Sequence, residues 1–291
     1  MVILIASLAA IIAIFTPFWG LIFTLIYSEK CQNKKYLFYT VFSGIAITFF
    51  LLKMVDFIGI FDVIFGVGII SFFYSKTLHE KFDYMNAILV IYFANIIKAI
   101  VKFFFFEEKF VQLFESAMQN SQAIIATYLE KNLEKFALMT EMIEKTTTFF
   151  IKHHLGIEVA LMTVAAYIAS LLISRKSPIK WKHNVARFPF FMVYFLIAGL
   201  MLILLSNYRI IGTNLLIALA PIFLIQGSTI LDFFWGNFFR KSKFLQVILI
   251  FSIVFNYYVL LLVMIVGLID FWFDIRKLKN NGGINENNLS K

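Results

Sequence analysis

The sequence predicts an all-α fold: a polytopic transmembrane bundle of about eight spans with one long amphipathic helical insert. Of its 291 residues 61% are hydrophobic and 15% are charged, whereas soluble domains are about half apolar and a quarter charged. The mean hydropathy is +0.87. The 37 Phe and only 4 Pro suit helices that face lipid better than the alternating strands of a barrel.

The apolar residues gather in stretches of about 20, the length that a helix needs to cross a bilayer. Four parts of the chain follow: spans one to four in 1–106, the insert in 107–156, spans five to eight in 157–279, and a polar, disordered tail in 280–291. The second and third spans are expected to form a tight hairpin. The eight expected spans are 2–27, 36–53, 56–74, 84–106, 157–174, 188–206, 211–235 and 244–273.

Apolar residues recur every three or four positions through 107–156, and most Glu and Lys residues fall on other faces. This period predicts an amphipathic helix or helix pair that lies on the membrane or on the bundle. A dedicated arm for docking a partner is the alternative. Seven Glu and five Lys in 107–152 argue against a polybasic sensor of anionic lipid.

Basic residues concentrate in three short loops, 28–36, 175–187 and 240–243. With eight spans all three loops fall on one side, which the positive-inside rule makes cytoplasmic. The N-terminus, the insert and Arg209 are then expected outside. The expected location is the cytoplasmic membrane of a bacterium.

The C-terminal basic residues disagree with this topology. Eight spans place Arg276, Lys277 and Lys279 outside, against the positive-inside rule. Either the rule fails there or the number of spans is off by one. A re-entrant or split segment near Pro17 or Pro221 would supply the missing span.

Polar side chains inside the spans are the candidates for function, because an ionised group in hydrocarbon costs at least about 2.5–3.5 kcal/mol. Six of them are expected toward the outer leaflet, where they would line one ligand pocket. Each also has a structural alternative: snorkelling for a Lys, capping for an Asp, and a bond across helices for an Asn. The six are Lys53, Asp56, Lys98, Lys102, Arg209 and Asn214.

Signatures of enzymes are poor. The sequence contains no phosphate-binding loop and none of the common hydrolase or metalloprotease motifs. The lone Cys31 excludes a disulfide framework within one chain. His153, His154 and Glu158 would be the metal ligands of an intramembrane enzyme, which is a minority hypothesis. The protein is expected to be no enzyme, to hold no cofactor or metal, and to bind no nucleic acid.

The last apolar stretch ends in "GLIDFWFDIRK", residues 267–277. Trp272 is typical of an interfacial aromatic belt. Asp270 and Asp274, four residues apart, repel each other and need cations. Lys277 is the expected partner of Asp274, and a basic residue elsewhere in the bundle is expected for Asp270.

Small residues on the first span allow close approach of another helix, in the bundle or on a partner protein. They are Ala6, Ala9, Ala10 and Ala13.

The C-terminal part of the chain carries a recognisable pattern: the stretch Gln226-Gly227-Ser228-Thr229-Ile230, then a basic loop and one more span, then the ending Gly267…Arg276. This pattern resembles DUF2232, the YybS-like bacterial membrane proteins. The resemblance implies a fold similar to the S subunits of energy-coupling-factor vitamin transporters. Such subunits bind a small molecule from outside and dock on a transmembrane partner, which the alanines of the first span would contact. The family-motif residues are Gln226, Gly227, Gly267, Asp270, Asp274 and Arg276.

Two functions from different classes follow. The first is the substrate-binding subunit of a small-molecule transporter, with an unknown ligand, in contact with the bilayer and a transmembrane partner. The second is a membrane scaffold that recruits proteins through its insert and has no transport activity.

Overall fold

The computed structural model describes residues 1–81, 83–129, 133–240 and 256–277, and every regular element in these ranges is helical. The predicted all-α membrane bundle is confirmed. The α-helices are α1 (Val2–Phe15), α2 (Pro17–Lys30), α3 (Lys35–Leu51), α4 (Phe57–Phe61), α5 (Ile70–Lys81), α6 (Tyr84–Leu129), α7 (Leu133–Lys176), α8 (Met192–Leu204), α9 (Arg209–Arg240) and α11 (Tyr257–Phe273). The shorter elements are the 3-10 turns η1 (Gln32–Lys34), η3 (His183–Val185) and η4 (Ser206–Tyr208), and the π-helix η2 (Asp62–Ile69).

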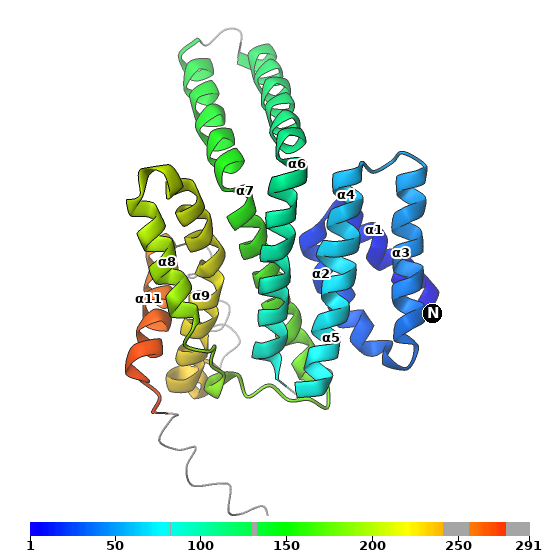
Figure 1. Ribbon diagram of the computed structural model, residues 1–291, viewed down its shortest axis with the longest axis vertical. Coiled ribbons are helices and arrows are strands. Elements are labelled where there is room, and N and C mark those ends of the chain that lie inside the picture. The colour runs from blue at the N-terminus through cyan, green and yellow to red at the C-terminus, as the bar shows by residue number, and fades with distance from the viewer. Residues whose placement is uncertain (82, 130–132, 241–255, 278–291) are drawn as a thin grey trace, which may run out of the picture.

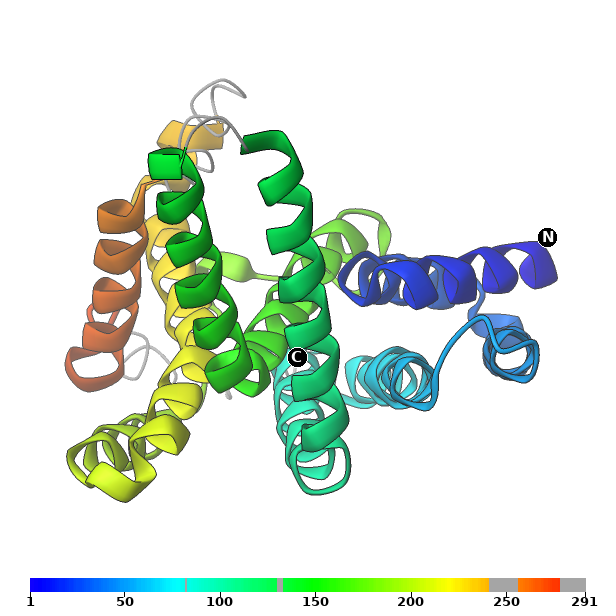
Figure 2. The same cartoon turned by 90° about the horizontal axis from the view of Figure 1, so that it is seen from above.

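The helices form two groups around a central pair (Figures 1 and 2). The antiparallel helices α6 and α7 stand in the middle, with α1–α5 on one side and α8, α9 and α11 on the other. Both α2 and α9 pack against α7, while α5 packs against α6. The central pair therefore joins the N-terminal and C-terminal parts of the chain.

Among the described residues four helical segments are long and apolar enough to cross a membrane. Three shorter apolar helices accompany them. The four segments are Phe57–Lys81, Tyr84–Ile124, Ala137–Lys176 and Ser206–Gly236, and the shorter helices are Val2–Phe15, Met192–Leu204 and Tyr257–Phe273.

The first expected span, 2–27, is two helices instead of one. Helix α1 ends before Thr16, whose φ of −147° is not helical, and Pro17 begins α2, a position that proline favours. Helix α2 folds back on α1, since a Cβ on Gly20 would lie 2.3 Å from the Cα of Ala13. Fourteen residues rise only about 21 Å, less than the thickness of a bilayer core of about 30 Å. The prediction of one span over 2–27 is therefore wrong, and the alternative of a split segment near Pro17 is the one observed.

The alanine face of α1 lies inside the fold. All four of its residues are 0% exposed, and α1 packs against α2 and α3. Of the two expected alternatives, contact within the bundle is the one observed, and the contact with a partner protein is corrected: small residues allow close approach, and helices of the same chain occupy the space. These residues are Ala6, Ala9, Ala10 and Ala13.

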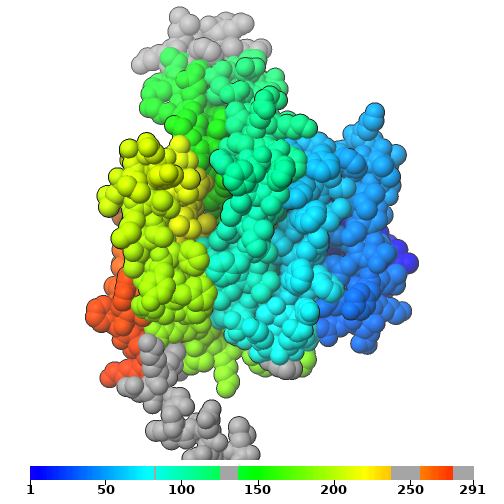
Figure 3. Space-filling model, viewed as in Figure 1, coloured from blue at the N-terminus to red at the C-terminus, as the bar shows by residue number. Residues whose placement is uncertain are grey.

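The insert is a continuation of two spanning helices. Helices α6 and α7 run without a break through the expected boundaries at 106/107 and 156/157. They rise beyond the other helices as an upright pair (Figures 1 and 3), whereas a helix lying on the membrane or the bundle was expected. The physical reason is local, because 84–176 contains no Pro and its Glu and Lys residues are good helix formers.

The C-terminal segment lies at the same end of the molecule as the basic loop 175–187. The guanidinium of Arg276 donates hydrogen bonds to the main-chain carbonyls of Asn184 (2.9 Å) and Ala186 (3.0 Å) in that loop. Helix α11 begins only at Tyr257, and residues 244–255 of the expected last span and the tail 280–291 lie outside the described residues. Arg276 thus lies at the same end of the molecule as the basic loop, as the positive-inside rule requires if that end is cytoplasmic.

Candidate functional site

Four ionisable side chains meet between η2, α6 and α7. Lys98 and Lys102 lie four residues apart on α6, so both point from one face of the helix. The Nζ of Lys98 lies 3.3 Å from Asp62 Oδ1 and also contacts Glu158 Oε1. The Nζ of Lys102 lies 3.0 Å from Asp62 Oδ2 and 2.9 Å from Glu158 Oε2. We call these four residues the charge quartet.

The quartet is neutral overall, and each charge has two opposite partners. The lysine side chains are 3% and 6% exposed, whereas those of Asp62 and Glu158 are 17% and 19% exposed. The carboxylates are thus the more accessible part. Removing any one group would leave a charge without compensation in an apolar environment, which is costly.

A local departure from α-helix geometry positions Asp62. The residue begins the π-helix η2, a form that occurs frequently at functional sites. Gly66 in the same element makes room for the quartet, because a Cβ there would lie 2.5 Å from the Nζ of Lys98. A larger residue at this position would displace the ammonium group of Lys98 from its present place.

A second polar layer follows toward the projecting ends of α6 and α7. The Nζ of Lys102 lies 5.8 Å from the ring centroid of Phe110, which stacks on the imidazole of His154 at 3.9 Å. His154 Nε2 lies 3.3 Å from Glu107 Oε2. Polar contacts between α6 and α7 thus continue past the quartet.

The metal group considered from the sequence does not assemble. Glu158 pairs with the two lysines, and His154 turns its Nδ1 to the carbonyl of Ile151 (2.9 Å). His153 instead lies beside the ring of Phe149. In the described part of the chain no group of three or more His, Cys, Asp or Glu side chains is arranged to hold a metal ion.

Of the six expected pocket residues, the structure brings only Lys98 and Lys102 onto common partners. Asp56 caps α4, where its Oδ1 accepts a hydrogen bond from Gly59 N at 2.8 Å. Lys53 has a positive φ of 57° in the exposed turn before α4. Arg209 is exposed at the start of α9.

Asn214, the last of the six, joins two helices. Its Nδ2 donates to the carbonyl of Lys152 (2.8 Å), and its Oδ1 accepts from Gly156 N (2.8 Å), both on α7. A Cβ on Gly156 would lie 2.4 Å from the carbonyl oxygen of Asn214. Asn214 therefore forms a bond across helices, the structural alternative expected for an Asn, and this bond holds α9 close to α7.

Asp62 and Glu158 are the site residues that the sequence reasoning missed. Asp62 is not among the six expected pocket residues, and Glu158 is considered from the sequence only as a metal ligand. A signal existed, since each is an acidic residue between apolar neighbours: Phe61 and Val63, Ile157 and Val159.

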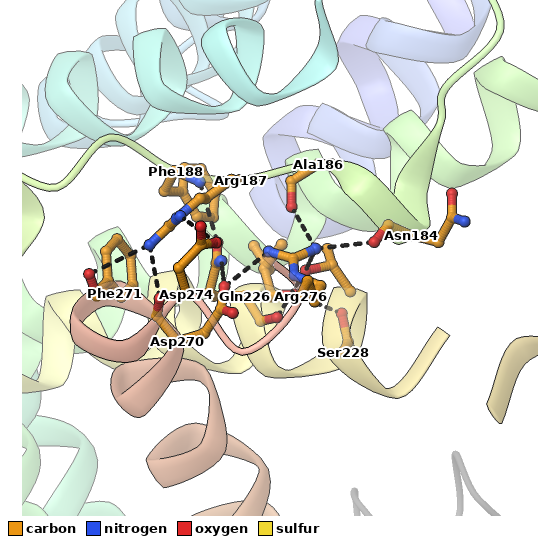
Figure 4. Close-up of polar contacts among 12 residues, drawn as sticks. Asn184, Ala186, Arg187, Phe188, Gln226, Ser228, Asp270, Phe271, Asp274 and Arg276 are labelled. Carbon is orange, nitrogen blue, oxygen red and sulfur yellow. Dashed lines mark hydrogen bonds and ion pairs between the residues drawn. The ribbon is translucent and has the colours of Figure 1, made fainter. Parts of the chain in front are cut away.

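The family-motif residues form a second polar site at the opposite end of the molecule from the projecting pair (Figures 1 and 4). Asp270 Oδ2 accepts hydrogen bonds from Gln226 Nε2 (2.7 Å) and Arg276 Nη2 (2.8 Å). Arg187 Nη1 donates to Asp274 Oδ1 (2.8 Å), and its Nη2 donates to the carbonyl of Asp270 (2.6 Å). We call these five residues the C-terminal clasp.

The expected partners of the two aspartates are corrected by the clasp. Asp274 pairs with Arg187 rather than Lys277, and Asp270 pairs with Arg276, only six residues later. Asp274 itself is the reason: its left-handed conformation (φ 42°, ψ 56°) ends α11 and turns the chain back. Aspartate tolerates this conformation better than most residues.

Two glycines bring α9 and α11 into close contact beside the clasp. A Cβ on Gly227 would lie 2.0 Å from the carbonyl oxygen of Val263, and one on Gly267 would lie 2.1 Å from that of Phe223. No other residue fits at these positions without moving the helices apart. The motif residues therefore act together, the glycines through backbone contact and the polar residues through hydrogen bonds.

A third cluster fastens the basic loop to α7 and α9. The hydroxyl of Tyr167 lies 2.9 Å from His183 Nε2 and 2.8 Å from Ser228 Oγ. His183 Nδ1 lies 3.1 Å from Asp232 Oδ2. With the clasp, this cluster gives the loop polar anchors on three helices.

Long apolar helices, buried ion pairs and basic loops at one end define a multi-pass membrane protein. The family described as "Predicted membrane protein (DUF2232)" matches residues 1–271, and the chain belongs to this family. The resemblance found in the sequence is thereby confirmed at the level of the family, while the likeness to transporter S subunits stays a prediction. No curated protein matches the chain. No solved structure matches it either.

Proposed function

We propose that the protein is a membrane-embedded subunit of a small-solute transport assembly and that the charge quartet is its solute-responsive site. The observation that carries the proposal is the meeting of four ionisable side chains from three helices within apolar segments. Each such group is expensive in hydrocarbon, and ionisable residues there commonly mark a pathway for a solute or ion. A role in stability alone is a weaker explanation, because apolar residues often replace buried ion pairs without loss.

The exposure of the quartet indicates the class of solute. The side chains of its acidic residues are 17% and 19% exposed, whereas those of its lysines are 3% and 6% exposed. An approaching solute therefore reaches the carboxylates first, and a carboxylate attracts a cationic group. Such a group competes with Lys98 and Lys102 for Asp62 and Glu158. Displacing a lysine loosens the tie between α6 and the helices beside it, which is how binding would reach a partner protein.

Energy for transport would come from partner proteins, since the sequence contains no phosphate-binding loop motif. We propose no enzymatic activity. We propose that the protein lies in the cytoplasmic membrane of a bacterium and that the end with the basic loops faces the cytoplasm, which the positive-inside rule favours.

A thermal-shift screen in detergent tests this function. Small organic cations, anions and neutral solutes are compared on the native protein and on the charge-balanced variant Asp62→Leu/Lys102→Met, with Arg209→Gln as control. We expect cations to raise the melting temperature of the native protein and of the control but not of the double variant. The proposal fails if no cation shifts the melting temperature, or if the double variant responds equally.

A scaffolding role is the second candidate, favoured by the exposed apolar side chains on the projecting ends of α6 and α7. Deletion of 110–150 separates the two functions. Loss of co-purifying proteins from an intact bundle supports scaffolding, and unaltered assembly supports the transport subunit. The exposed residues are Leu113, Ile124, Leu138, Met139, Met142, Phe149 and Phe150.

A further inference from the structure

The α1–α2 hairpin creates an open hollow at its base. It is lined by the first three residues, by the turn from Lys30 to Lys34 and by Leu37 of α3. Its volume is about 470 Å³. The hollow exists only because α2 returns to the level at which α1 begins, so a single straight span over 2–27 would not have produced it.

The hollow carries positive charge without an internal counter-charge. Lys30 and Lys34 line it and are exposed, and no acidic side chain is among its lining residues. The nearest acid in sequence, Glu29, points to His79, with Oε2 2.7 Å from Nε2. The Nζ of Lys30 lies over the ring of Tyr27, 4.3 Å from its centroid. An anion would therefore complete this site.

Part of the lining is apolar. Val2, Ile3 and Leu37 line the hollow, and the last two are 59% and 43% exposed. A hydrated inorganic anion gains nothing from these apolar side chains, whereas an acyl chain does. The lining thus combines a cationic rim with an apolar flank at the end of membrane helices, the composition of sites for anionic lipid headgroups.

We propose that this hollow binds an anionic phospholipid, with its phosphate between Lys30 and Lys34 and an acyl chain along Ile3 and Leu37. The site is separate from the charge quartet and does not depend on the proposed transport function. The lipid would fasten the base of the α1–α2 hairpin to one leaflet.

Cys31 reports on occupancy, because the only cysteine of the chain lines the hollow and is 6% exposed. Its alkylation by a maleimide is followed in detergent with added phosphatidylglycerol, phosphatidylcholine or inorganic phosphate. We expect phosphatidylglycerol to slow labelling at least threefold, and the other two to leave it unchanged. Equal protection by phosphatidylcholine, or protection by inorganic phosphate alone, overturns the proposal.

Matched variants test the cationic rim. Lys30→Gln/Lys34→Gln removes two charges from the hollow, and Lys176→Gln/Lys180→Gln removes two from a different loop at the same end of the molecule. Native mass spectrometry counts bound phosphatidylglycerol in each. We expect the first pair to lose a bound lipid that the second retains. Equal loss in both pairs indicates general electrostatic attraction and overturns the proposal, as does retention of that lipid by the first pair.

Discussion

The carboxylate of Asp270 accepts a hydrogen bond from the guanidinium of Arg276 at 2.8 Å, and both side chains are 0% exposed. In the sequence, Asp274 lies between the two residues. Its left-handed backbone conformation ends α11 and turns the chain back. Arg276 then reaches the loop that begins after α7. One ion pair thus fixes both the end of the last described helix and its contact with the basic loop.

The Asp270–Arg276 pair predicts a large loss of stability when one partner is removed. Asp270→Asn leaves a buried guanidinium without its counter-charge, which typically costs about 3–5 kcal/mol. Thermal unfolding in detergent measures the change. Asp270→Leu/Arg276→Met should lose less than the single variant, because no buried charge remains. A melting temperature of Asp270→Asn equal to that of the native protein would contradict the pairing.

The contact of α9 with α11 predicts that Gly227→Ala is destabilising, because its Cβ would lie 2.0 Å from the carbonyl oxygen of Val263. Gly44→Ala is the matched control within a helix, with nothing within 4 Å of the added Cβ. The control should be neutral or more stable by up to about 1 kcal/mol, since Ala is the better helix former. Melting temperatures of the two variants check this. Similar shifts in both would show that the close helix contact is absent.

The charge quartet predicts a coupling between Glu158 and Lys98. Glu158→Gln should destabilise the protein by about 3 kcal/mol or more, because it leaves excess positive charge among apolar helices. Adding Lys98→Met restores neutrality and should recover part of the loss. A double-mutant cycle of melting measurements yields the coupling. Additive effects of the two substitutions would mean that the side chains do not interact.

The position of Arg276 against the basic loop predicts which residues share a side of the membrane. In a Cys31→Ser background, Lys180→Cys and Lys277→Cys should react with an impermeant thiol reagent from the same side. Ser206→Cys, in the turn between α8 and α9 at the other end (Figure 1), should react from the opposite side. Intact and opened membrane vesicles distinguish the two. Labelling of positions 180 and 277 from different sides would exclude the described C-terminal fold.

Residue type predicted some members of the charge quartet, but the sequence did not predict which residues would lie close together. Lys98 and Lys102 were identified because charge is rare in an apolar stretch, and their spacing placed them on one face. Their partners Asp62 and Glu158 are 36 to 60 residues away, and no periodicity relates such distant segments. Asn214 and Asp56 were also identified as polar residues, but they do not line a shared pocket. Asn214 bonds to α7, and Asp56 bonds within α4.

The sequence by itself determined that the protein lies in a lipid bilayer, that it is all-α, and which family it belongs to. Composition, the length of the apolar stretches and a motif are properties of the chain alone. Only the tertiary structure decided that α2 folds back on α1, that the insert extends α6 and α7, and that Arg187 rather than Lys277 pairs with Asp274. These outcomes depend on backbone turns at Thr16 and Asp274 and on the packing of distant helices. At Thr16 and at Asp274 the backbone conformation of one residue changes the direction of the chain. A hydropathy profile does not reveal such a turn.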